Sequence, residues 1–173
     1  MLVILASSMG VHFSIDWRWR SPQEDQIQHS LFQSERVGYP RLEVDFKGWA
    51  ANLGLLYYFS YYDPLYDDEV EIAFWDLTFG RRFELPWGFE LTPWAGTGFS
   101  RASSFSFGVE NGEVKGYKGP VFLGGADLAW GLPPVRAKLV ATGGYRVIPG
   151  WFPGSLHHQW ELGLGLRFNA WGE

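Results

Sequence analysis

The sequence predicts an all-β fold, an eight-stranded antiparallel up-and-down barrel formed by all 173 residues as one domain. Three observations support this prediction. The 22 glycines and 10 prolines are scattered along the chain and leave few windows in which a helix is favourable. Apolar and polar residues alternate in eight segments, which is the period of a strand with two different faces. The connections between these segments alternate between short and long, as in an up-and-down barrel.

The alternating segments are the expected strands. In the first of them Phe13, Ile15 and Trp17 lie on one face and Ser14, Asp16 and Arg18 on the other. The same alternation recurs along the chain at residues 11–19, 41–47, 52–61, 69–82, 89–99, 122–130, 135–146 and 159–168. In the fourth segment the phase slips by one residue at Phe74 and Trp75, and we expect a β-bulge there.

The connections fall into two groups by length. Three are short, at residues 48–51, 85–88 and 131–134, and four are long, at residues 20–39, 63–68, 101–118 and 148–158. We expect residues 103–118 to form a protruding hairpin that turns at Asn111 and Gly112. Short turns at one rim and long loops at the other are typical of a barrel inserted into a membrane from one side.

Composition excludes several classes of protein. The chain has no cysteine, which excludes a disulfide scaffold and a thiol nucleophile. A net charge of −5 argues against a nucleic-acid partner, and no apolar run is long enough for a transmembrane helix. Residues 1–8 are apolar and then small, and we interpret them either as the end of a leader or as an extension of the first strand.

The charged residues lie almost entirely on the polar faces of the strands, with nearly equal numbers of each sign. A narrow eight-stranded barrel can be filled by side chains alone, so paired charges inside and apolar residues outside predict a transmembrane barrel. The expected interior charge network comprises Asp16, Arg18, Arg41, Glu43, Asp45, Lys47, Glu71, Asp76, Arg82, Glu90, Asp127, Arg136, Lys138, Arg146, Glu161 and Arg167. The alternative is a soluble carrier with its apolar face inside, but the early Gly-x-Trp signature usual in such carriers is absent.

Glycines and aromatic residues fit the two faces of this barrel. Glycines on the polar faces, such as Gly54, Gly125 and Gly165, would make room for long interior side chains. Aromatic residues near strand ends are typical of the girdles at the two membrane interfaces. The expected girdle comprises Trp17, Trp19, Tyr57, Tyr61, Trp75, Trp130, Tyr145 and Trp160.

The last segment carries a family resemblance. Glu161, Gly163, Leu166 and Phe168 match the polar–glycine–hydrophobic–aromatic pattern that the outer-membrane assembly machinery recognises in its substrates. Five residues follow Phe168, whereas the aromatic residue normally lies at or near the terminus, and Trp171 is an alternative end. Residues 91–99 are similar to the Pro-aromatic-x-Gly-x-Gly strand of small outer-membrane barrels. The chain thus resembles the OmpA/OmpX-type superfamily along nearly its whole length.

The resemblance implies location and fold, and leaves activity open. We expect a monomer in the bacterial outer membrane with periplasmic termini and extracellular long loops. Its expected partners are outer-membrane lipids, lipopolysaccharide and the assembly machinery, and no cofactor is expected. The expected role is structural, adhesive or surface-interacting, with a largely closed lumen. The alternatives are a narrow channel for small or hydrophobic solutes and a barrel-embedded enzyme that modifies lipid A.

Two groups of residues are candidate sites for other chemistry. His12, Ser14 and Asp16 are residue types that a hydrolase uses, but alternate strand residues stand about 7 Å apart, too far for a direct Ser–His hydrogen bond. A hydrogen-bond network in the barrel interior is the simpler interpretation. Asp63, Asp67 and Asp68 are weak calcium candidates, and a solvated acidic rim is the simpler interpretation there.

Overall fold

The structure is a computed structural model that describes residues 9–22, 37–63, 68–104, 109–110, 113–114, 117–132, 136–149 and 156–171. At some strand ends only the backbone is described. The barrel strands are β1 (Met9–Pro22), β2 (Val37–Phe46), β3 (Trp49–Asp63), β4 (Asp68–Arg81), β6 (Phe89–Ser104), β9 (Tyr117–Gly131), β10 (Ala137–Pro149) and β11 (Leu156–Trp171). The short elements are β5 (Phe83–Glu84), β7 (Val109–Glu110), β8 (Glu113–Val114) and the 3₁₀ turn η1 (Pro86–Gly88).

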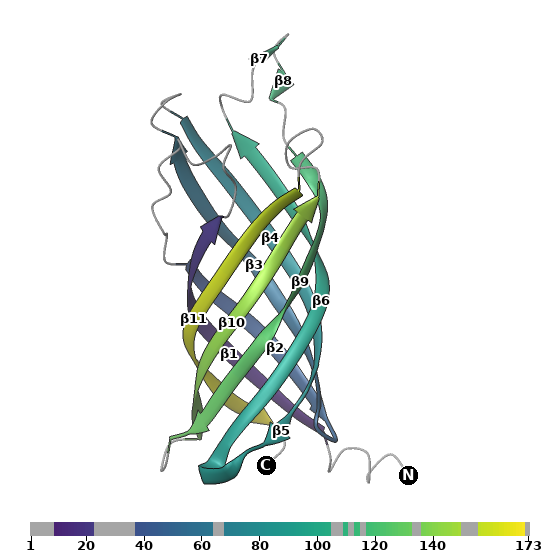
Figure 1. Ribbon diagram of the computed structural model, residues 1–173, viewed down its shortest axis with the longest axis vertical. Coiled ribbons are helices and arrows are strands. Elements are labelled where there is room, and N and C mark those ends of the chain that lie inside the picture. Colours follow the sequence, from purple (N-terminus) through teal and green to yellow (C-terminus); the bar gives the residue numbers. More distant parts are fainter. Residues whose placement is uncertain are drawn as a thin grey trace.

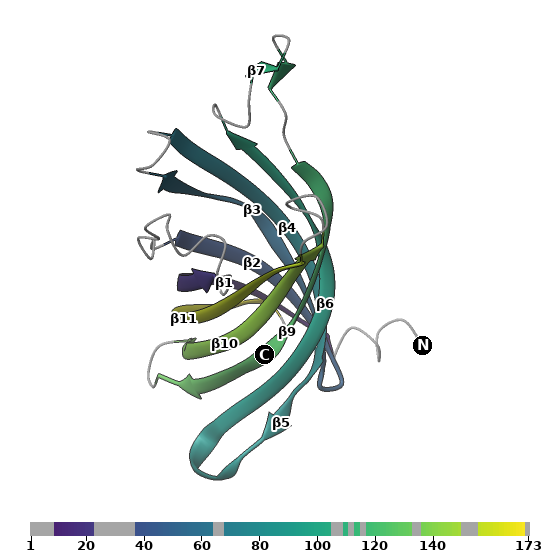
Figure 2. The same cartoon turned by 45° about the horizontal axis from the view of Figure 1, so that its top comes forward.

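These eight long strands form one closed antiparallel barrel. Consecutive strands pair in order around the ring, β4 pairs with β6, and β1 pairs with β11 to close it. The strands run diagonally around a common axis, with the short connections at one end and β7 and β8 beyond the other (Figures 1 and 2). The predicted fold class is therefore confirmed. Among the residues described, no helix is both long enough and apolar enough to cross a bilayer.

The strands extend further toward the loop end than the sequence predicted. β2 begins at Val37, β6 continues to Ser104 and β9 begins at Tyr117, so parts of the expected loops 20–39 and 101–118 are strand. These loop-end segments lack the clear alternation that marked the strand centres, yet ladder hydrogen bonds to their neighbours extend them. The predicted hairpin is present in part, because Val109 pairs with Val114 and Glu110 with Glu113, whereas the expected turn at Asn111 and Gly112 lies outside the described residues.

The expected bulge lies in a different strand. β4 pairs with β6 without any irregularity, whereas the β3–β4 register shifts between Gly54 and Tyr57. The extra residue therefore belongs to β3. Phe74 is fully buried in the interior, so the apolar residue that suggested a phase slip in β4 is an interior side chain. The irregularity lies opposite Trp75, between the pairs Gly54–Asp76 and Tyr57–Phe74, so the predicted place of the bulge is right and the predicted strand is wrong.

The turn between β2 and β3 is a tight two-residue hairpin. Phe46 pairs with Trp49, and Lys47 and Gly48 between them have φ of 53° and 78°. Two successive positive φ values are typical of the type I′ turn, whose twist matches that of the flanking strands. Lys47 is consequently outside the strand alternation, and its side chain is exposed.

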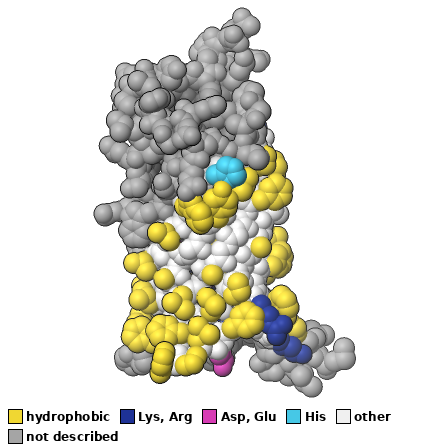
Figure 3. All heavy atoms as spheres, viewed as in Figure 1, with side chains coloured by type: hydrophobic (Ala, Val, Ile, Leu, Met, Phe, Trp, Pro, Cys, Tyr) yellow, Lys and Arg dark blue, Asp and Glu magenta, His cyan; other side chains and the backbone are white. Residues whose placement is uncertain are grey.

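The two faces of the barrel have opposite character. Large apolar side chains are exposed on the outer wall, among them Leu162 at 66%, Phe79 at 58% and Phe122 at 53%. The buried side chains include many charged ones, such as Asp16 and Arg146 at 0%. On the face shown in Figure 3, hydrophobic side chains cover the described outer surface, and the Lys, Arg, Asp and Glu side chains seen there lie at the end that carries the short turns. Water-soluble proteins show the reverse distribution.

Candidate functional site: the charged barrel interior

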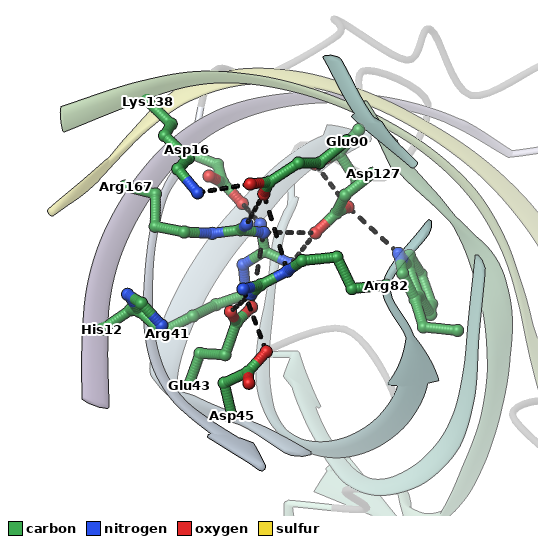
Figure 4. A network of polar contacts seen from close by, with 12 residues as sticks. His12, Asp16, Arg41, Glu43, Asp45, Arg82, Glu90, Asp127, Lys138 and Arg167 are labelled. Atoms are coloured by element: carbon green, nitrogen blue, oxygen red, sulfur yellow. Dashed lines mark hydrogen bonds and ion pairs between the residues drawn. The ribbon is translucent and has the colours of Figure 1, made fainter. Parts of the chain in front are cut away.

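Four basic and five acidic side chains form a continuous ionic network across the barrel. Arg82 lies against Glu43 (2.5 Å) and Asp45 (2.9 Å), and its Nε is 3.5 Å from Glu90. Lys138 lies 2.5 Å from the same Glu90. These contacts join β2, β6, β10 and Arg82, the residue that follows β4, across the interior, and they are drawn in Figure 4.

Arg167 links this group to the middle of the barrel. Its guanidinium lies 3.3 Å from Glu43, 3.8 Å from Glu90 and 3.6 Å from Asp127. Arg41 then lies 2.8 Å from both Asp127 and Asp16. Because most of these groups are removed from solvent, each charge depends on its partners for stabilisation.

Asp127 is the acceptor for donors from several strands. Its Oδ1 accepts hydrogen bonds from the Trp94 indole N–H (3.0 Å) and the Thr142 hydroxyl (2.9 Å). Its Oδ2 accepts one from Arg41 (2.8 Å). The carboxylate is 1% exposed. A buried carboxylate with this many donors is a satisfied structural group, and it fixes β2, β6 and β10 relative to β9.

A second ionic group lies around Arg146. Its two terminal nitrogens donate to the two oxygens of Asp76 at 3.1 and 2.8 Å, and Glu161 lies 3.4 Å away. The Tyr39 hydroxyl donates to Asp76 at 2.8 Å. The guanidinium lies 4.5 Å above the ring of Phe74. The bidentate contact and the ring fix the plane of the guanidinium.

Glycines provide the space for the largest interior side chains. A Cβ at Gly125 would lie 2.7 Å from the Trp94 ring, and one at Gly144 would lie 3.0 Å from it. A Cβ at Gly54 would overlap the Tyr39 ring, and one at Gly165 would meet Asp16. These glycines therefore occur where the wall must approach a bulky or charged interior group.

Most of the expected interior charges whose side chains are described lie in these two groups. Lys47 and Arg136 do not, and their expected place in the interior is wrong. Lys47 lies in the β2–β3 turn over the Phe46 ring, and Arg136 precedes β10 and is exposed. Neither residue belongs to a strand, so the alternation does not apply to them. The side chains of Arg18 and Glu71 lie outside the described residues.

His12, Ser14 and Asp16 are all buried in the interior, but their partners lie on other strands. The His12 Nδ1 lies 2.9 Å from the Asn169 Oδ1 on β11, and Asp16 pairs with Arg41 on β2. His158, next to His157 in the sequence, lies 2.5 Å from the Tyr145 hydroxyl through its Nδ1. The calcium candidates Asp63, Asp67 and Asp68 lie outside the described side chains. Among the residues described, no cluster of potential metal ligands is found.

Several of the aromatic residues expected in the girdle are exposed on the outer wall. Trp75, Trp130 and Trp160 are 40%, 47% and 50% exposed, and Tyr145 packs against Trp160 with ring centroids 4.7 Å apart. The other four expected girdle residues, Trp17, Trp19, Tyr57 and Tyr61, have side chains outside the described set. Trp49 and Trp87, at 57% and 89% exposure, lie at the short-turn end, where the sequence predicted only turns.

The residues of the expected assembly signal lie on β11 and alternate between the two faces. Glu161 and Gly163 are buried and Phe168 is 39% exposed. β11 continues beyond Phe168 to Trp171 and pairs with β1 along its length. Several interior residues were not predicted from the sequence, among them Tyr39 and Phe74. Tyr39 has the same parity as Arg41 and Glu43, so extending the β2 pattern toward Val37 would have placed it inside.

The closed eight-stranded antiparallel barrel is the fold of a class of small bacterial outer-membrane proteins. The structure is similar to Neisserial surface protein A (15% identity, TM-score 0.57), with 93% of this chain and 96% of that chain covered. It is similar to the attachment invasion locus protein Ail of Yersinia pestis (18%, 0.56; coverage 92% and 99%). It is also similar to a major outer membrane protein from Thermus thermophilus (14%, 0.57; 91% and 99%). No protein-family model and no curated protein matches the chain.

Proposed function

We propose that this protein is an integral outer-membrane barrel whose lumen is closed by salt bridges and whose loop end interacts with the cell's surroundings. The inverted distribution of side chains carries the proposal. An outer wall on which Leu162, Phe79 and Phe122 are more than half exposed would be unfavourable in water. The same wall is favourable in lipid, and closure satisfies every strand edge within the bilayer.

Electrophoresis of the refolded chain tests the membrane part of the proposal. The chain is refolded into detergent micelles and run with and without boiling. A membrane barrel resists the electrophoresis detergent until it is boiled, so the unboiled sample should migrate differently. The matched control is L162E/L164E, which places two charges on the outer wall and should remove the folded band. Identical migration of boiled and unboiled wild type would contradict the proposal.

The orientation of the barrel is proposed from the position of its connections. Short turns face the periplasm and long loops the outside in barrels inserted from one side. An epitope inserted between Glu110 and Glu113, at the tip of the β7–β8 hairpin, should therefore be labelled by antibody on intact cells. The same epitope inserted between Lys47 and Gly48 should be labelled only after the outer membrane is permeabilised. The reverse pattern would contradict this orientation.

The surface-interaction role is supported by the protrusion of β7 and β8 beyond the barrel end, which Figure 1 shows. Ail, one of the similar structures, is called an attachment invasion locus protein and has been solved with the heparin analogue sucrose octasulfate. Bacteria displaying this barrel should adhere to an epithelial cell layer more than bacteria whose residues 105–116 are replaced by a short turn. Equal adhesion, with both barrels shown to be folded, would contradict the role.

The ionic network makes a permanently open channel unfavourable. Arg41, Arg167 and Asp127 meet in the middle of the interior, and all three are at most 3% exposed. We therefore expect no steady conductance in planar bilayers. Regular single-channel openings of the wild-type protein would favour the channel alternative.

A further inference from the structure

Arg101 and Lys118 form a like-charge pair on the outer wall near the loop end of the barrel. They lie directly opposite each other in the register between β6 and β9, and both are exposed. The adjacent pair, Ser100 and Gly119, is buried. Because side chains alternate between the two faces, Arg101 and Lys118 project outward from the barrel. Both residues fall within a segment that the sequence predicted to be a loop.

Among the side chains that the structure describes, none compensates the charge of this pair. Directly opposite residues on antiparallel strands have Cβ atoms about 5 Å apart, and like charges at this position destabilise the sheet. Neither cation makes an ion pair or a ring contact with any side chain that the structure describes. The exposed cations at the opposite rim differ: Lys47 lies 5.3 Å from the Phe46 ring and Arg81 lies 5.3 Å from the Trp49 ring.

The position of Arg101 and Lys118 along the barrel axis indicates which part of a lipid molecule lies next to them. Immediately below them on the outer wall lie Phe99 and Pro120, which are paired and exposed. Trp75 is packed against Phe99 with ring centroids 6.2 Å apart. The two cations thus follow directly on the apolar belt, at the level where lipid headgroups replace acyl chains. Their ligand should therefore be the anionic headgroup of a lipid whose chains cover Phe99 and Trp75.

We propose that Arg101 and Lys118 bind a phosphate group of a lipopolysaccharide molecule packed against β6 and β9. An arginine fork and a lysine ammonium about 5 Å apart at their Cβ atoms provide two convergent donors for one phosphate. The phosphate also neutralises the repulsion between them. The choice of lipopolysaccharide rests on the proposed function, in which the loop end faces the outer leaflet.

The test measures retention of lipid by the full chain refolded in detergent. Wild type, R101Q/K118Q and the matched control K47Q/R81Q are each incubated with diphosphoryl lipid A or with phosphatidylglycerol, and bound lipid is counted by native mass spectrometry. The control removes the same charge from the opposite rim. Boiled and unboiled migration is checked for every variant, and K118Q alone replaces the double variant if that variant does not fold.

Wild type and K47Q/R81Q should retain lipid A about tenfold better than R101Q/K118Q, since one charge-assisted hydrogen bond corresponds to roughly that factor. Equal retention by wild type and R101Q/K118Q would overturn the site. Equal retention of phosphatidylglycerol and lipid A by wild type would overturn the choice of lipopolysaccharide. A wild type whose migration is not changed by boiling would instead refute the proposed membrane function, so the two failures are distinguishable.

Discussion

Replacing Asp127 with alanine would remove the acceptor on which the middle of the barrel depends. Arg41, Trp94 and Thr142 donate hydrogen bonds to this carboxylate, and Arg167 lies 3.6 Å from it. The residue is 1% exposed. After D127A, all four groups would remain in the interior without this acceptor, and Arg41 would retain Asp16 as an ionic partner.

The expected loss of stability follows from these contacts. Removing one partner of a buried ion pair costs about 3–5 kcal/mol, because the other charge is left uncompensated. The orphaned indole N–H and hydroxyl add about 1 kcal/mol each. The free energy of unfolding should therefore fall by about 5–7 kcal/mol. T142A removes only one neutral donor and should cost about 1 kcal/mol.

Denaturant titration of the refolded barrel measures these losses. Folded protein is quantified by its unboiled migration and by tryptophan fluorescence, in wild type, D127A, T142A and K47Q. Lys47 is exposed in a turn, so K47Q should change stability by less than about 0.5 kcal/mol. D127N keeps the side-chain shape and one acceptor oxygen, and its loss should lie between those of T142A and D127A.

One result would refute the reasoning. If D127A lost no more stability than T142A, the Asp127 carboxylate would not be stabilising the buried guanidinium groups around it. A double-mutant cycle with R41M provides a second check, since residues in one ionic network should show a coupling energy above about 0.5 kcal/mol. Purely additive effects of D127A and R41M would contradict the direct contact between Arg41 and Asp127.

Three further predictions concern other parts of the interior. R146M should destabilise the barrel by about 3–5 kcal/mol in the same titration, because Asp76 and Glu161 lose their counter-charge, and an unchanged midpoint would contradict this. G144A should cost about 1–3 kcal/mol through its clash with Trp94, and W94F should cost less in the G144A background than in wild type; equal costs would place the strain elsewhere. H12A/S14A should leave the lipid A of expressing cells unchanged by mass spectrometry, because His12 lies against Asn169; altered acylation would support the enzyme alternative.

The alternation of the sequence was sufficient to assign most side chains to the correct face. Asp16, Arg41 and Glu161 were expected inside and are buried, and Phe13, Leu77 and Trp160 were expected outside and are exposed. The rule failed at positions where another constraint determines the backbone. Lys47 lies in a type I′ turn, and Arg136 precedes its strand. Phe74 was misassigned because an apolar residue packs inside, under the Arg146 guanidinium.

The sequence could not show where the strands end at the loop side. Arg101 and Lys118 resembled loop residues because they are charged and lie beyond the clearest alternation. In the structure, β6 and β9 pair as far as Ala102 and Tyr117, and this pairing brings the two cations opposite each other. Where a strand ends depends on how far its partner strand extends beside it, and the local sequence pattern carries no information about that partner.

The sequence by itself determined that the chain forms an antiparallel barrel with a polar inner face and an apolar outer face, because a strand's two faces are recorded as a period of two residues. Only the tertiary structure decided which interior charges meet. Arg41 and Asp127 are separated by 86 residues, and Arg146 and Asp76 by 70. Their contacts depend on the stagger of the strands around the closed ring, which sets the height of every interior side chain.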